Sequence, residues 1–228
     1  MTLVFIRIFM FTLLPLLMAG ALVRLDKSSN SRQRRLELFL LFLFSLGVAG
    51  NGIGNFFGHF FISDLVAESI GWPAGSPFQL EVGFANLALG VLGVIAVGRR
   101  DGFREATVIA VTIFAVGATI VHIIDIIETA NLAPGNTWQN VINLIRPVLL
   151  ISFLAAARRS ERDPASLEQD STFDAWRQPR AMVAGRATGI VATGFGVGFA
   201  IDQPVIATAI AVLVASLVTA SVISRSQT

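Results

Sequence analysis

Residues 36–62 read LELFLLFLFSLGVAGNGIGNFFGHFFI, and this stretch decides the fold. It is long enough to cross a bilayer, because a transmembrane helix needs about 20 mostly apolar residues. Its polar side chains are regularly spaced: Asn51, Asn55 and His59 recur every four residues and so share one helical face. Two amides and an imidazole in line are costly against lipid. We therefore expect this face to point into the interior of a helix bundle or a wet cavity.

A stripe of glycines, Gly50, Gly54 and Gly58, runs beside that polar face. Small residues at every fourth position let the backbone of another helix come close. We predict that these three glycines serve helix packing.

The whole chain shares the apolar character of this stretch. Of its 228 residues, 54% are hydrophobic and 14% charged, and the mean hydropathy is +0.72; a soluble domain carries about 25% charged residues. The sequence predicts an all-α, polytopic membrane protein with about seven transmembrane helices. The predicted spans are 3–23, 36–62, 79–97, 106–127, 139–157, 183–201 and 205–223. The sixth is short and rich in glycine, so a re-entrant hairpin of the last two stretches is the alternative.

The distribution of basic residues predicts the orientation, because cytoplasmic loops collect Lys and Arg. In the seven-span arrangement 15 of the 17 basic residues fall on one face of the membrane. The loops on the other face carry acidic residues and no basic ones. We expect the N-terminus outside and the C-terminus inside the inner (plasma) membrane of a bacterium. Arg7 lies in the first span, close enough to the outer boundary to snorkel. The first span lacks a basic segment before it, which argues against a cleaved signal peptide.

This arrangement divides the chain into four parts. The first transmembrane helix takes residues 1–24, and a four-helix core membrane domain takes 36–157. A cytoplasmic linker, 158–181, mixes Arg, Glu, Asp, Ser and Pro and is expected to be solvated. A C-terminal helix pair takes 182–224.

Polar residues of the four core spans gather in the outer half of the membrane, if depth is counted at about 1.5 Å per residue from each boundary. We expect them to line a polar pocket that opens to the non-cytoplasmic side. Arg146 needs an anionic partner because a guanidinium stays protonated, and Asp125 and Glu81 lie at about the right depth. A buried ion pair that only fixes helix register is the alternative. The candidate pocket residues are Asn55, His59, Glu81, His122, Asp125, Asn143 and Arg146.

The same residues disfavour most cofactors. No cysteine is present, which excludes thiol chemistry and iron–sulfur ligation. His59 and His122 lie on different helices without a Glu-x-x-His pattern, so neither a metal nor haem is expected. The only lysine, Lys27, is in a predicted loop, which excludes a retinal Schiff base. The composition also argues against nucleic-acid binding.

Three segments resemble an uncharacterised family of bacterial inner-membrane proteins: GHFF at 58–61, IGWPAGSPF at 70–78 and EVGFANLALG at 81–90. More distantly, the order of loop, Pro-Phe and Glu-x-Gly resembles the DoxX-like four-helix membrane families. The resemblance implies a four-helix core with Ser76, Pro77, Phe78 and Glu81 at the start of the third span. Some DoxX-like members are linked to quinone or thiol redox complexes, and the lack of cysteine here argues against a thiol role.

The sequence leaves three functions open. The first is a binding or accessory membrane protein whose pocket holds a lipid, a quinone or another small amphiphile, in a larger complex or a homo-oligomer. A quinone's carbonyls could accept hydrogen bonds from His59, His122 or Asn55. The second is an oxidoreductase that uses His122 and Asp125 in proton transfer. The third is a transporter, which the lack of a repeat and the off-centre polar groups disfavour.

Overall fold

The structure is a computed structural model that describes residues 2–25 and 31–162. Within these ranges, five helical runs are long and apolar enough to cross a membrane: Val4–Leu25, Arg32–Phe61, Phe78–Gly98, Gly102–Thr129 and Pro134–Glu161. They match the first five predicted spans, so the prediction of an all-helical chain whose helices could span a membrane is confirmed for the described residues. The predicted sixth and seventh spans, and the linker from residue 163 on, lie outside the described residues.

The first two runs each contain a π-helical segment. The first consists of α1 (Thr2–Ile8), η1 (Phe9–Leu13) and α2 (Leu14–Leu25). The second consists of α3 (Arg32–Phe42), η2 (Leu43–Gly50) and α4 (Asn51–Phe61). The remaining helices are α5 (Ser63–Ile70), α6 (Phe78–Gly98), α7 (Gly102–Thr129) and α8 (Pro134–Glu161).

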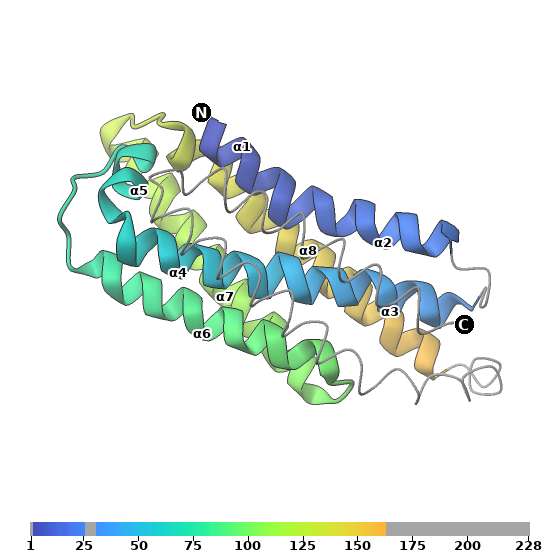
Figure 1. Cartoon of the computed structure of the whole chain (residues 1–228). Coiled ribbons are helices and arrows are strands. Elements are labelled where there is room, and N and C mark those ends of the chain that lie inside the picture. The colour runs from blue at the N-terminus through green and yellow to red at the C-terminus, as the bar shows by residue number, and fades with distance from the viewer. Residues whose placement is uncertain (1, 26–30, 163–228) are drawn as a thin grey trace.

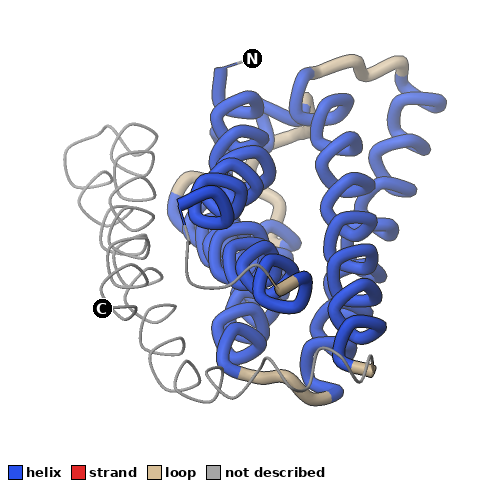
Figure 2. The backbone as a smooth tube through the Cα atoms, turned by 90° about the vertical axis from the view of Figure 1, so that its right-hand side faces the viewer, coloured by secondary structure: helices blue, strands red, loops and turns tan. Residues whose placement is uncertain are grey.

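The second run lies at the centre of the bundle (Figure 1). Its α3 packs on α2 and α8, its η2 packs on η1 and α6, and its α4 packs on α6. Residues 40–54 are buried throughout, as expected of a helix that is apolar on all sides. Figure 2 shows the described part as helices joined by short loops at the two ends.

We name the two ends by the interactions found there. The amide end holds the N-terminus, α5, the end of α7 and the start of α8, and the ion-pair end holds the start of α3, the α6–α7 loop and the end of α8 (Figure 1). These helices run in the alternating directions that the short loops require.

The backbones of α4 and α6 touch at glycines. A Cβ atom on Gly52 would lie 2.6 Å from the carbonyl oxygen of Asn86, and one on Gly93 would lie 2.7 Å from the amide nitrogen of Ala49. The predicted stripe makes other contacts: Gly50 packs on Phe11, Gly58 packs on Val66 at an ordinary distance, and Gly54 is buried. The close crossing of α4 and α6 therefore uses Gly52, which the stripe did not include.

The helices extend beyond the predicted spans, and an extra helix follows the second. At the ion-pair end α7 begins at Gly102 and α8 continues to Glu161, because Arg158 pairs there with Glu105 and with Glu161. Residues 63–70, between two predicted spans, form α5, which ends at Gly71. Gly71 has φ +80°, the left-handed conformation that ends many helices.

Candidate functional site

A series of side-chain hydrogen bonds crosses the amide end, from the first helical run through α4 to α6. Arg7 Nη2 donates to Asn55 Oδ1 at 2.5 Å, and Asn55 Nδ2 donates to Asn86 Oδ1 at 3.1 Å. Asn86 Nδ2 then donates to the carbonyl oxygen of Val82 at 2.8 Å. The predicted inward face of α4 is thus occupied by hydrogen bonds. Arg7 points into the bundle and does not snorkel outward, which corrects the expectation for the first span.

Arg146 approaches the same face of α4 one turn away. Its Nη2 atom donates to Asn51 Oδ1 at 3.2 Å, and its side chain is only 6% exposed. Among the described residues Arg146 forms no ion pair, and its buried Nε has no hydrogen-bond partner. We call Arg7, Arg146, Asn51, Asn55 and Asn86 the amide cluster.

The expected acidic partners of Arg146 lie elsewhere. Glu81 is exposed on α6, because the residues of α6 that face α4 are Gly83, Asn86 and Gly90. Asp125 belongs to a separate group at the end of α7. The predicted pairing of Arg146 with these two carboxylates is therefore wrong.

The start of α8 adds further buried polar atoms. Gln139, Asn143 and Arg146 follow one another on one face of α8, and Gln139 Nε2 donates to Asn143 Oδ1 at 3.1 Å. The Gln139 Oε1 and Asn140 Oδ1 atoms are buried without a hydrogen-bond partner within the described residues. Buried polar atoms are normally paired, so each such atom requires an explanation.

His122 and Asp125 take part in a clasp that joins three segments of the amide end. Trp72 Nε1 donates to Asp125 Oδ2 at 2.9 Å, and the Trp72 ring stacks on the His122 ring with centroids 5.2 Å apart. Asn136 lies between His122 and Asp125: its Oδ1 contacts His122 Nδ1 at 2.7 Å and its Nδ2 donates to Asp125 at 2.8 Å. Asn131 donates to the same carboxylate at 2.8 Å. Trp72 thus holds its loop against the end of α7.

His59 forms a third, separate contact. Its Nδ1 lies 2.5 Å from Gln79 Oε1 across the α4–α6 interface. Its neighbours Phe56 and Phe60 pack with Phe84 of α6 at centroid distances of 5.4 and 5.9 Å. The structure therefore places five of the candidates in three separate groups, while Asn143 bonds to Gln139 and Glu81 is exposed. The three groups are Asn55 with Arg146, His122 with Asp125, and His59. In the described part of the chain no three His, Asp or Glu side chains form a group that could hold a metal ion.

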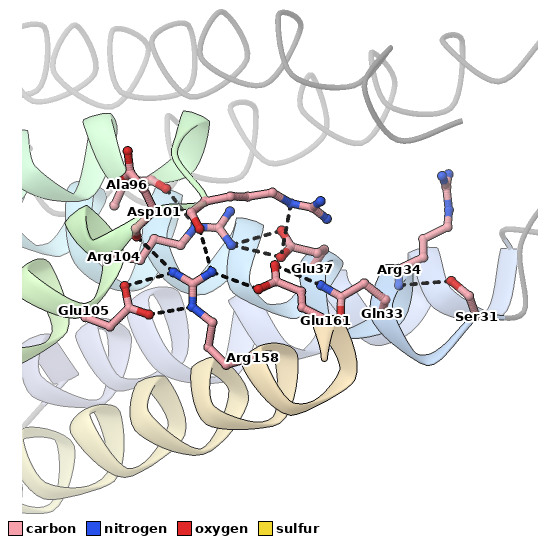
Figure 3. A network of polar contacts seen from close by, with 11 residues as sticks. Ser31, Gln33, Arg34, Glu37, Ala96, Asp101, Arg104, Glu105, Arg158 and Glu161 are labelled. Atoms are coloured by element: carbon pink, nitrogen blue, oxygen red, sulfur yellow. Dashed lines mark hydrogen bonds and ion pairs between the residues drawn. The ribbon is translucent and has the colours of Figure 1, made fainter. Parts of the chain in front are cut away.

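The ion-pair end contains a buried charge network that the sequence analysis did not identify (Figure 3). Glu37, 1% exposed, accepts two hydrogen bonds from Arg104 Nη1 at 3.0 and 3.1 Å, and Arg104 Nε donates to the carbonyl of Ala96 at 3.1 Å. Arg158 pairs with Glu105 at 2.5 Å and with Glu161 at 2.9 Å. These bonds join α3, α6, α7 and α8, and each of these arginines has a carboxylate.

Both π-helical segments border the amide cluster. η1 begins two residues after Arg7, and η2 ends immediately before Asn51. The two segments pack on each other, and a Cβ atom on Gly47 would lie 3.3 Å from the Phe11 carbonyl oxygen. A π-helical turn changes the angle at which the following side chains project, and such turns are frequent at functional sites. Two features of the sequence indicate this cluster. One is a charged residue, Arg7, inside an apolar span, and the other is the four-residue spacing of Asn51 and Asn55.

Residues 7–163 match the model of a protein family described as a family of unknown function, DUF6790. This confirms the resemblance to an uncharacterised family, while a likeness to the DoxX-like families is not shown. The comparisons with curated proteins and with solved structures found no match.

Proposed function

The chain belongs to DUF6790, a family of unknown function, and we propose from its own geometry that it binds a polar-headed amphiphile at the amide end. The observation that supports this proposal is the set of buried, unpartnered polar atoms on one helix, Gln139 Oε1, Asn140 Oδ1 and Arg146 Nε. A buried donor or acceptor without a partner costs about 1–3 kcal/mol. A ligand headgroup between the helices would supply the missing hydrogen bonds, and its apolar part would lie against the exposed apolar helix faces.

A lipid and a quinone both fit this description, since each combines hydrogen-bonding oxygens with a long apolar chain. The basic loops described above support the view that the amide end faces away from the cytoplasm of a bacterial inner membrane. The headgroup would then come from the outer leaflet. The protein would act as a binding or accessory subunit, alone, as a homo-oligomer or in a membrane complex.

The geometry gives less support to proton transfer by His122 and Asp125. The two side chains do not contact each other directly, because the Asn136 amide lies between them. An amide is a poor proton carrier, and the contacts of Asp125 with Trp72 and Asn131 are those of a loop clasp. Catalysis and transport are therefore the alternatives that the following experiment distinguishes from binding.

Purified full-length protein tests the proposal through the molecules that it retains. The extract of wild type is compared by mass spectrometry and by ultraviolet absorption with the extract of Gln139→Met, which removes an unpartnered carbonyl at nearly constant volume. We expect a retained lipid or quinone whose amount falls in Gln139→Met. Glu81→Gln is the matched control, because Glu81 is exposed on α6.

Two results would contradict the proposal: an extract free of amphiphiles, or equal retention by wild type and Gln139→Met. A retained quinone that the protein reduces or oxidises would instead support the oxidoreductase. Uptake of a solute into vesicles, without a retained amphiphile, would support the transporter.

A further inference from the structure

The two arginines of the amide cluster, Arg146 buried and Arg7 half-buried, bind neighbouring positions of α4. Arg7 donates to Asn55 and Arg146 donates to Asn51, and these asparagines are one turn apart on α4. Cβ atoms at this spacing are about 6 Å apart. The two guanidiniums therefore bind neighbouring asparagines on the same face of α4. Two like charges thus meet inside the bundle, where their repulsion is screened less than in water.

Only neutral groups meet these charges in the described residues. The hydrogen bonds of both guanidiniums end on amide oxygens, and neither arginine has an ion pair within residues 2–25 and 31–162. An amide oxygen accepts a hydrogen bond but does not neutralise the charge. A buried charge is costly unless it is paired. The same chain gives Arg104 and Arg158 carboxylates at the other end, so the missing anion is specific to the amide end.

The remaining N–H groups of the Arg7 and Arg146 guanidiniums have a geometry that suits an anion. A guanidinium presents five N–H groups in a planar fork that matches the oxygens of phosphate or carboxylate. Arg146 still has a buried Nε without a partner, and each arginine uses one Nη in the bonds described above. Two forks side by side can hold a single group with two or more oxygens.

We propose that Arg7 and Arg146 together bind one oxyanion, a phosphate or carboxylate group, in the amide cluster. This inference rests on the proposed function and names the chemistry of the headgroup. The anion reaches the site either as part of an anionic lipid or as a free ion. In both cases Asn51 and Asn55 orient the two guanidiniums, and the anion neutralises them.

The test uses full-length protein, freed of lipid in detergent micelles. Three probes are added separately: phosphatidylglycerol, which is anionic, phosphatidylcholine, which is zwitterionic, and inorganic phosphate. Binding is measured by native mass spectrometry and by the change in Tm. The variants are Arg7→Gln and Arg146→Gln, which remove one charge each, and Arg146→Lys, which retains the charge without the fork. Arg24→Gln is the matched control, because Arg24 is an exposed arginine on the same helical run as Arg7.

We expect wild type to prefer phosphatidylglycerol to phosphatidylcholine, and both Gln variants to bind phosphatidylglycerol about tenfold more weakly. Arg146→Lys should fall between them and wild type, and Arg24→Gln should match wild type. An equal rise in Tm with inorganic phosphate alone would support the site and assign it to a free anion.

Equal retention of both lipids by wild type and by the Gln variants would overturn this inference and leave the proposed function standing. Retention of no amphiphile and no phosphate would overturn both. An internal carboxylate is the remaining alternative, and Asp202, outside the described residues, is its candidate. If Asp202→Asn lowered Tm strongly while wild type bound no anion, the partner would belong to the chain and the inference would be wrong.

Discussion

Arg104 and Arg146 are both buried in the bundle, at 2% and 6% exposure, yet their surroundings are opposite. Arg104 at the ion-pair end has a carboxylate that accepts two hydrogen bonds from it. Arg146 at the amide end donates to one neutral amide, that of Asn51, and the asparagine one turn away, Asn55, accepts from a second arginine, Arg7. A charge that serves only the fold can have a permanent partner inside the protein. A charge without one, in the described part of the chain, indicates a partner that comes from elsewhere.

The largest expected effect separates these two arginines directly. Arg104→Met should destabilise the protein by about 3 kcal/mol, because the buried carboxylate of Glu37 loses both hydrogen bonds from Arg104 Nη1 and retains the more distant ion pair with Arg100 at 3.6 Å. Arg146→Met should change the stability of the lipid-free protein by less than about 1 kcal/mol, since it removes an uncompensated charge together with one hydrogen bond to Asn51. Thermal unfolding of both variants in detergent measures the difference. Equal losses of stability would show that the two ends are built alike.

A second prediction concerns the contact that positions the amide cluster. Gly52→Ala places a Cβ atom 2.6 Å from the backbone of Asn86 and of Gly90, so α4 and α6 must move apart. We expect a loss of about 1–3 kcal/mol and a lengthened bond between Asn55 and Asn86. Gly117→Ala is the matched control, because no atom lies within 4 Å of that position and alanine favours a helix; it should add about 0.5–1 kcal/mol. A neutral Gly52→Ala would contradict the close crossing.

The sequence predicts the amide end in part, and the reason is geometric. Helical periodicity places Asn51 and Asn55 on one inward face, and the structure shows both accepting hydrogen bonds from arginines. Counting residues from a membrane boundary gives depth but not the rotation of a helix about its axis. Glu81, chosen by its depth, is therefore exposed on α6 instead of facing α4.

The ion-pair end could not be predicted in this way. Glu37 and Arg104 are 67 positions apart, and no local pattern connects them. Hydropathy assigns Arg104 and Arg158 to loops at the membrane boundary, so the predicted spans exclude both, whereas Glu37 lies inside the predicted span 36–62. Only the packing of four helices brings the opposite charges together.

A smaller effect is expected at the clasp of the amide end. Trp72→Phe keeps a ring that can stack on His122 but removes the N–H group that donates to Asp125. Asp125 retains Asn131 and Asn136 as donors, so Tm should fall by only about 2–4 °C. Phosphatidylglycerol binding should be unchanged, because the clasp and the amide cluster share no hydrogen bond. A loss of binding in Trp72→Phe would show that the two parts of the amide end act together.

The smallest effect belongs to the exposed pair at the opposite end. Arg99 donates to Asp101 Oδ2 at 2.5 and 2.9 Å, and this bond, with that from the Phe103 amide, lowers the pKa of Asp101. A carboxyl group with a lowered pKa stabilises the fold above its unfolded pKa, and the contribution is lost as pH falls through the folded value. Asp101→Asn keeps the helix cap on Phe103, since Asn caps as well as Asp, and removes only the charge.

Asp101→Asn should therefore lower Tm by less than about 2 °C at pH 7. The difference from wild type should begin to shrink as pH falls below about 4 and vanish once pH is below the lowered pKa of Asp101 in the folded protein. High salt should reduce it at neutral pH, because exposed charges are screened. The buried pair of Glu37 and Arg104 should respond weakly to the same salt. If salt weakened both pairs equally, Glu37 would be accessible to water, and the contrast between a closed, self-neutralised end and an end that awaits an anion would be lost.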